Sequence, residues 1–244
     1  DGTFDDCQNL VKQAFLNEKI NASITLSSAN SINISRLIPQ TFYYFNAYSQ
    51  LSQKSPVIFS VPSGNFGNLT AGIFSKFMGL PIEKFIASTN LNDTVPRYMQ
   101  TGIYTPKASV DTISNAMDVG NPSNMNRIFD IYNNDLCLIK NDIESYSFND
   151  NQTKNHIKDV MKKYNYILDP HCAVGSLGLE HFLKTNSCKN PGICLATAHP
   201  SKFSDVIEPI IKTSVDMPNR LKNMMSKEKR SMKINNNFNE FSDY

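Results

Sequence analysis

Residues 57–75 constrain the fold of this chain more than any other segment. Residues 57–61 (VIFSV) form a mostly apolar run between two prolines, which predicts a short strand buried on both faces of a sheet. The turn GNFGN follows at residues 64–68, and residues 69–78 then have a helical pattern. A strand that passes through a tight turn into a helix is the first half of a βαβ unit, so a parallel sheet is expected.

The remaining sequence repeats this alternation. Residues 84–88 and 192–197 are predicted to be further strands, and helices are predicted at residues 7–16, 36–51, 92–102, 122–132, 155–164, 173–183 and 203–213. In the helix at 36–51, the side chains of Leu37, Phe42, Phe45 and Tyr48 are expected to face the core. Residues 141–154 are expected to be a polar loop.

The whole pattern predicts an α/β fold with a mostly parallel sheet flanked by helices. Residues 1–218 are expected to form the body of this fold, and residues 219–244, rich in Lys and Asn, a C-terminal tail.

The turn at residues 64–68 has the features of a phosphate site. Glycines let a ligand approach the backbone closely, and the free N–H groups at a helix N-terminus attract an anion. The turn lacks the third glycine of a dinucleotide fingerprint, and no Gly-Lys-Ser/Thr follows as in a P-loop. Charge-assisted hydrogen bonds of about 1.5–3 kcal/mol each would hold a phosphate ester there. Alternatively, a strand-to-helix turn simply needs glycines and polar caps, and the turn alone leaves both interpretations open.

Composition excludes several classes of function. The net charge of +2, from 24 basic and 22 acidic residues, gives no basic excess for nucleic-acid binding. No apolar run has membrane-spanning length. The 5 cysteines are scattered, odd in number and without a CxxC pair, which predicts reduced thiols in a cytoplasmic protein and no metal site.

Segments along nearly the whole chain resemble threonine synthases, and the bacterial form of that family more than the plant form. They are residues 28–36 (SANSINISR), 61–72 (VPSGNFGNLTAG), 88–97 (STNLNDTVPR), 115–124 (NAMDVGNPSN), 169–175 (DPHCAVG) and 195–203 (LATAHPSKF). The resemblance implies a fold-type-II pyridoxal-phosphate enzyme, similar to tryptophan synthase β. Such an enzyme converts O-phospho-L-homoserine, a small-molecule substrate, and water to L-threonine and phosphate, the last step of threonine biosynthesis.

The resemblance also implies roles for single residues. The phosphate of the cofactor, pyridoxal 5'-phosphate, would bind to the turn made by Gly64, Asn65, Phe66, Gly67 and Asn68. The Thr197 hydroxyl would donate to the nitrogen of the cofactor ring, which a hydroxyl can do without protonating it.

Two polar clusters are candidates for substrate binding. Ser31, Asn33 and Arg36 could receive the substrate's carboxylate or phosphate, with Arg36 bonding in a bidentate manner; the alternative is a helix cap followed by a structural ion pair. Asp118 and Asn121 could orient substrate, or could serve only the turn chemistry around the neighbouring glycine and proline.

Lysines mark a departure from the family. Its Schiff-base lysine lies in a Phe-Lys-Asp motif upstream of the phosphate turn, and this sequence has no such motif. Lys54 and Lys76 are expected to be solvated, and Lys202 to lie at the surface or support the site. The expectation is therefore the C-terminal part of a threonine synthase, incomplete at its N-terminus, with no catalytic residue in this chain and inactive by itself.

Two alternatives differ in function. One is a non-catalytic fragment of such an enzyme. The other is a related fold-type-II dehydratase or phospho-amino-acid lyase, which residues 88–97 and 115–124 disfavour because such relatives share the cofactor turn more readily than these two stretches.

Overall fold

The computed structural model describes residue 2 and residues 4–243. Its contacts divide the chain into two compact units. The larger unit is Ala29–Ser214, and the smaller one combines Asp1–Ser28 with Val215–Tyr244.

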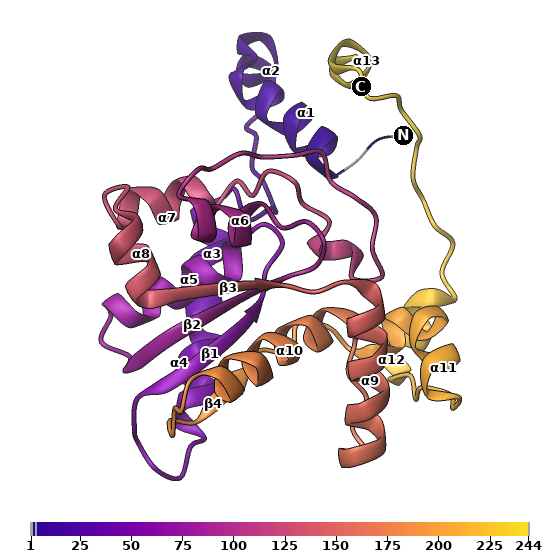
Figure 1. Ribbon diagram of the computed structural model, residues 1–244. Coiled ribbons are helices and arrows are strands. Elements are labelled where there is room, and N and C mark those ends of the chain that lie inside the picture. The colour runs from indigo at the N-terminus through magenta and orange to yellow at the C-terminus, as the bar shows by residue number, and fades with distance from the viewer. Residues whose placement is uncertain (1, 3, 244) are drawn as a thin grey trace. The chain divides into compact units, whose positions relative to one another are not determined.

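The larger unit is built on a parallel sheet of four strands in the order β3-β2-β1-β4 (Figure 1). The strands are β1 (Val57–Pro62), β2 (Ile82–Thr89), β3 (Ile143–Ser147) and β4 (Gly192–Cys194). In the centre of the sheet, Phe59 of β1 is paired with Phe85 of β2 and Ile193 of β4. The predicted parallel sheet is confirmed, although β4 ends three residues before the predicted end of its strand at residue 197.

The helices of the larger unit cover both faces of this sheet. They are α3 (Ile34–Leu37), α4 (Thr41–Ser49), α5 (Gly67–Phe77), α6 (Thr94–Thr101), α7 (Met125–Ile131), α8 (Leu136–Asp142), α9 (Asp150–Tyr164), α10 (Pro170–Thr185) and α11 (Ser204–Ile211), with 3-10 turns η1 (Ile38–Gln40), η2 (Asn115–Met117) and η3 (Pro200–Phe203). Figure 1 shows α10 running along the sheet, and the contacts place it on β1 and β2.

Alternation along the strands assigns side chains to the two faces. Phe59 and Phe85 pack on one face with Tyr44 of α4 in the main core. Ile58 and Ile86 point to the other face and meet Phe182 of α10. All of these strand side chains are fully buried, and each contributes about 1.5–3 kcal/mol of burial free energy. An apolar strand of this kind needs cover on both sides, which is what the run at residues 57–61 predicted.

The helix predicted at residues 36–51 is wrong in its continuity and its burial. The chain forms α3, then η1 with Pro39 inside it, and only then α4. Proline has no N–H to donate within a continuous α-helix, so the segment forms a 3-10 turn at this point. Because of this turn, α4 directs different side chains toward the core than a continuous helix would. Leu37 is buried as expected, but Phe42 and Phe45 are 67% and 38% exposed.

The predicted polar loop at residues 141–154 is also wrong. It contains β3, which pairs with β2, and the beginning of α9. Asn149 caps α9 by accepting from the Gln152 N–H, while the Gln152 side chain accepts from the Asn149 N–H at 2.9 Å. This reciprocal capping box was present in the sequence as an Asn followed three residues later by a Gln.

The smaller unit is helical, with α1 (Phe4–Leu16), α2 (Glu18–Ser23), α12 (Asn219–Met225) and α13 (Phe238–Ser242). Leu10 and Ala14 of α1 are buried, and α1 contacts α13. In the described residues of both units, every helix is too short or too polar to span a bilayer.

Candidate functional site

The carboxyl ends of β1 and β4 place two predicted site segments side by side. The turn at residues 64–68, whose last two residues begin α5, follows β1, and Thr197 lies three residues beyond the end of β4. Because β1 and β4 are adjacent and parallel, both segments emerge at the same edge of the sheet, where α/β folds bind ligands. A cavity of about 320 Å³ lies there, lined by Tyr43, Asn46, Asn68, Leu195, Ala196 and Thr197. The structure thus brings predicted residues Asn68 and Thr197 together.

The backbone of the turn has the donors that a phosphate needs. In the part of the chain that the structure describes, nothing accepts from the backbone N–H groups of residues 64–69; the first helical bond runs from the Thr70 N–H to the Phe66 carbonyl, at 3.0 Å. Phe66 precedes α5 in the left-handed conformation, with φ 60°. Unpartnered N–H groups at the positive end of a helix are the arrangement that binds a phosphate group.

Both glycines of the turn lie where no side chain fits. A Cβ at Gly64 would stand 2.7 Å from the Met117 Cα, and a Cβ at Gly67 would stand 2.8 Å from the Ser31 Cβ. The glycines therefore serve close packing of the turn against its neighbours, in addition to any approach of a ligand.

Asn65 holds the turn in place through its side chain. Its Oδ1 accepts from the Ser123 N–H at 2.7 Å and from the Ser123 hydroxyl at 3.0 Å, and its Nδ2 donates to the Ser31 Oγ at 2.8 Å. Asn124 donates to the Asn65 carbonyl at 2.9 Å and is itself bonded by Arg127 at 2.6 Å. The Asn65 amide is thus engaged within the protein, and only its backbone N–H stays available to a ligand.

Asn68 is fixed by a buried tyrosine. The Tyr44 hydroxyl donates to the carbonyl and to the side-chain Oδ1 of Asn68, both at 2.8 Å. Tyr44 is fully buried, and burial raises the pKa of its phenol well above the usual value, so the hydroxyl keeps its proton. Since Oδ1 is occupied, the Nδ2 group of Asn68 is the part of its amide left to face the cavity.

The first candidate substrate cluster does not act as one group. Ser31 accepts from Asn65 and so belongs to the support of the turn. Asn33 caps α3 by accepting from the Ser35 N–H at 3.0 Å, as the alternative interpretation expected. Arg36 is exposed, and among the described residues it has no acidic partner, so the ion pair of the alternative interpretation is not present there.

The second candidate pair separates as well. The Asp118 carboxylate accepts from the Asn90 amide at 2.8 Å, the Asn92 amide at 3.1 Å, and the Thr112 hydroxyl and N–H at 2.7 and 3.0 Å. Burial nevertheless raises the pKa of Asp118. This carboxylate braces a loop, whereas Asn121 is exposed, and neither lines the cavity beside Thr197.

A buried pair links α10 to the turn. Asp169 accepts from the His171 Nδ1 at 2.9 Å, and the His171 Nε2 accepts from the Ala116 N–H at 3.2 Å. These partners define a neutral imidazole with its proton on Nδ1. The Ala116 carbonyl lies 2.9 Å from where a Gly64 Cβ would be. By binding the Ala116 N–H, the pair therefore holds η2 close to the turn.

Sequence reasoning missed several of these supports, namely Tyr44, Ser123, Asn124 and Arg127. The segment NPSN at residues 121–124 carried part of the signal, since Ser123 and Asn124 had no other assignment.

The lysines are placed mostly as predicted. Lys54 is exposed and donates to three nearby carbonyls, and Lys202 is exposed. Lys76 is not a solvated lysine, because its Nζ lies 2.9 Å from the Asp142 carboxylate in a half-buried pair.

The parallel sheet with helices on both faces is the fold of the fold-type-II pyridoxal-phosphate enzymes. The structure of threonine synthase from Escherichia coli matches all of this chain with a TM-score of 0.93 and 40% identity, and the chain covers 56% of it. Pyridoxal-phosphate-bound threonine synthase from Brucella melitensis matches all of this chain with a TM-score of 0.86 and 33% identity, and the chain covers 57% of it.

Sequence comparisons agree with the structural comparisons. The family described as "Threonine synthase, C-terminal" matches residues 172–244. A threonine synthase of Buchnera aphidicola subsp. Schizaphis graminum is 45% identical over all of this chain. Over its whole length the chain is similar to threonine synthases, and it spans 56% of the length of that relative.

Proposed function

We propose that this chain supplies the cofactor-phosphate and ring-nitrogen contacts of a threonine synthase active site. The N–H groups of residues 64–69 would bind the phosphate of pyridoxal phosphate, and the Thr197 hydroxyl would donate to the ring nitrogen. The observation that supports this most strongly is the run of unpartnered N–H groups beside the cavity that contains Asn68 and Thr197.

The chemistry divides between the cofactor and the protein. When bound, the cofactor supplies the electron sink for carbanion chemistry. The chain's own residues hold and orient it: the turn offers neutral donors to a doubly charged group, and the two glycines keep the turn compact. A hydroxyl donor such as Thr197 leaves the ring nitrogen unprotonated, which makes the ring a milder electron sink than a carboxylate partner would.

The proposed reaction of the whole enzyme is the conversion of O-phospho-L-homoserine and water to L-threonine and phosphate. Of the candidate substrate residues, only Arg36 is positively charged, and its exposed guanidinium could bind an anionic group of the substrate. The bonds within the protein give a structural role to Ser31, Asn33 and Asp118, which would position the neighbouring backbone. Asn121 is exposed and would contact substrate only at the surface. A biosynthetic enzyme of this kind would work in the cytoplasm, where its free cysteines stay reduced.

A chimeric enzyme tests the proposal. This chain would replace the matching C-terminal part of the Escherichia coli threonine synthase, a substitution favoured by the TM-score of 0.93. We expect the chimera to bind pyridoxal phosphate and to release phosphate from O-phospho-L-homoserine. A folded chimera that does not bind the cofactor would contradict the assigned site, and one that binds it without releasing phosphate would contradict the assigned reaction.

A matched pair of glycine variants localises the cofactor. Gly64→Ala forces a Cβ to within 2.7 Å of the Met117 backbone and should abolish cofactor binding. Gly79→Ala is the control, because its φ of 100° makes it costly for stability although nothing lies within 4 Å. Equal cofactor affinity in the two variants would refute binding at the turn.

A further inference from the structure

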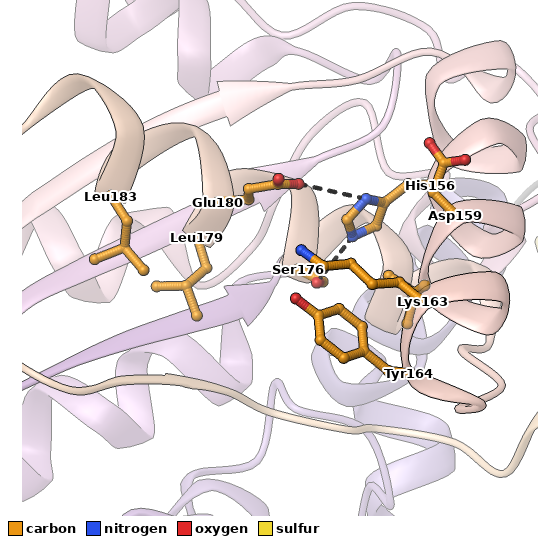
Figure 2. A pocket seen from close by; sticks show the side chains of 9 residues that line it. His156, Asp159, Lys163, Tyr164, Ser176, Leu179, Glu180 and Leu183 are labelled. Atoms are coloured by element: carbon orange, nitrogen blue, oxygen red, sulfur yellow. Dashed lines mark hydrogen bonds and ion pairs between the residues drawn. The ribbon is translucent and has the colours of Figure 1, made fainter.

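A second cavity lies between α9 and α10, and none of its lining residues lines the cavity at Thr197. Its volume is about 290 Å³. Figure 2 shows His156, Asp159, Lys163 and Tyr164 entering from α9, and Ser176 and Glu180 from α10. Ligand sites range over roughly 300–1,000 Å³, so this cavity suits only a small molecule.

Opposite charges are held apart at this cavity. Asp159 and Lys163 are spaced as neighbours on one helix face, yet among the described residues neither has an ion pair. The Lys163 ammonium instead lies over the Tyr164 ring, 4.9 Å from its centroid. Glu180 bonds Lys184 through Oε1 at 2.7 Å, while its Oε2 is turned toward the cavity. The cavity therefore has the Lys163 ammonium and the carboxylates of Asp159 and Glu180 at separate positions.

The floor of the cavity is neutral and ordered. The His156 side chain is only 9% exposed, and its Nε2 is 2.9 Å from the Ser176 Oγ. Burial lowers the pKa of His156, so its ring is uncharged at neutral pH. A ligand resting on this floor would meet two polar groups already paired with each other.

The order of Ser176, His156 and Glu180 is that of a hydrolytic triad, but the geometry does not support hydrolysis. The His156 Nδ1 is 3.6 Å from the Glu180 Oε2, which is too long for a hydrogen bond. Ser176 lies in the middle of α10, where neighbouring N–H groups are used by the helix and none can form an oxyanion hole. Binding is therefore the better interpretation of this cavity.

One side of the cavity is apolar. Val160, Leu179 and Leu183 line it, and Figure 2 shows the two leucines on the α10 side, beyond the polar cluster. A ligand that contacts both parts must carry charges at one end and a short aliphatic group at the other.

We infer that this cavity binds a small zwitterion with an aliphatic side chain, the chemical class of the apolar α-amino acids. The ligand's carboxylate pairs with Lys163, its ammonium group with Glu180 and Asp159, and its side chain with Leu179 and Leu183. This inference does not depend on the proposed cofactor site, because none of these residues belongs to it.

Nuclear magnetic resonance of the 244-residue chain, titrated with L-leucine, tests the inference. We expect saturable shifts confined to signals of α9 and α10. Lys163→Met should weaken binding about two- to fivefold, because the Lys163 ammonium is exposed and water screens its pairing with a carboxylate. Lys162→Met removes the same charge from the neighbouring position, which does not line the cavity, and should leave the affinity unchanged.

Two analogues separate a zwitterion site from simpler ones. 4-Methylpentanoate lacks the ammonium group and 3-methylbutylamine lacks the carboxylate, and both should bind about two- to fivefold more weakly than L-leucine, the loss of one exposed ion pair. The inference is overturned if L-leucine gives no saturable shifts, if Lys163→Met binds as tightly as Lys162→Met, or if either analogue matches L-leucine. If L-leucine binds to the chain but not to the chimera described above, the N-terminal part of the enzyme covers this cavity. That result would also overturn the inference.

Discussion

Tyr44→Phe is the variant that best separates the support of the phosphate turn from the packing of the core. It removes the hydroxyl that donates to the Asn68 carbonyl and Oδ1, both at 2.8 Å. It keeps the ring, which packs edge-on against Phe59 and Phe85 with centroids 4.8 and 6.2 Å away. Because the ring contacts survive, any effect reports the hydrogen bonds.

The size of the expected effect depends on how many hydrogen bonds the Tyr44 hydroxyl makes and on how exposed Asn68 is. One hydroxyl proton is shared between two acceptors, so about one bond is lost, with a net value of about 0.5–1.5 kcal/mol. Asn68 is half-buried, so water can replace part of that bond. We expect a loss of about 1 kcal/mol in unfolding free energy, and about three- to tenfold weaker cofactor binding as the turn loosens.

Denaturant unfolding of the chain and cofactor titration of the chimera measure the two effects. Tyr48→Phe is the control, since Tyr48 lies on the same helix but its hydroxyl makes no hydrogen bond within the described residues. If Tyr44→Phe matched this control in both assays, the hydroxyl would not support the turn.

Other variants test three further contacts. Lys76→Met should lower the unfolding free energy by about 1–3 kcal/mol, because the Asp142 carboxylate that Lys76 pairs with is only 13% exposed. A double-mutant cycle with Asp142→Asn should show coupling between the two residues; additive effects would contradict this. His156 has a lowered pKa, so the unfolded chain binds its proton more tightly and stability should fall as the pH drops below about 6.5, a slope that His156→Gln should remove; an equal slope in both proteins would refute it. His171→Leu should cost about 1–3 kcal/mol in urea unfolding, because the Ala116 N–H loses its acceptor and the buried Asp169 keeps only its two backbone N–H donors; an unchanged midpoint would refute it.

The centre of the fold could be predicted from the sequence because its signals are local. The apolar run at residues 57–61 has no polar face, so it had to be a doubly covered strand, and the glycine turn after it marked the start of α5. The parallel direction of β1 and β4 follows from the alternation of elements. Their adjacency, which brings Asn68 and Thr197 to one cavity, could not be predicted from that pattern.

The rest depended on contacts between distant residues. β3 carries Glu144 and two serines, and its strand character comes from pairing with β2 rather than from apolar alternation. Tyr44 acquires its role only when α4 packs on α5, because its target Asn68 is 24 residues away. The hydrogen bonds that occupy Asn65 likewise join residues 34 and 58 positions apart.

Within the described residues, the order β3-β2-β1-β4 places β3 and β4 at the two edges of the sheet, and β4 is only 3 residues long. An edge strand invites strands of other molecules to add to the sheet, which is a common route to aggregation. An edge of this length offers an incoming strand too few hydrogen bonds to offset the ordering that pairing requires. The short length of β4 therefore limits edge-to-edge association on its side of the sheet.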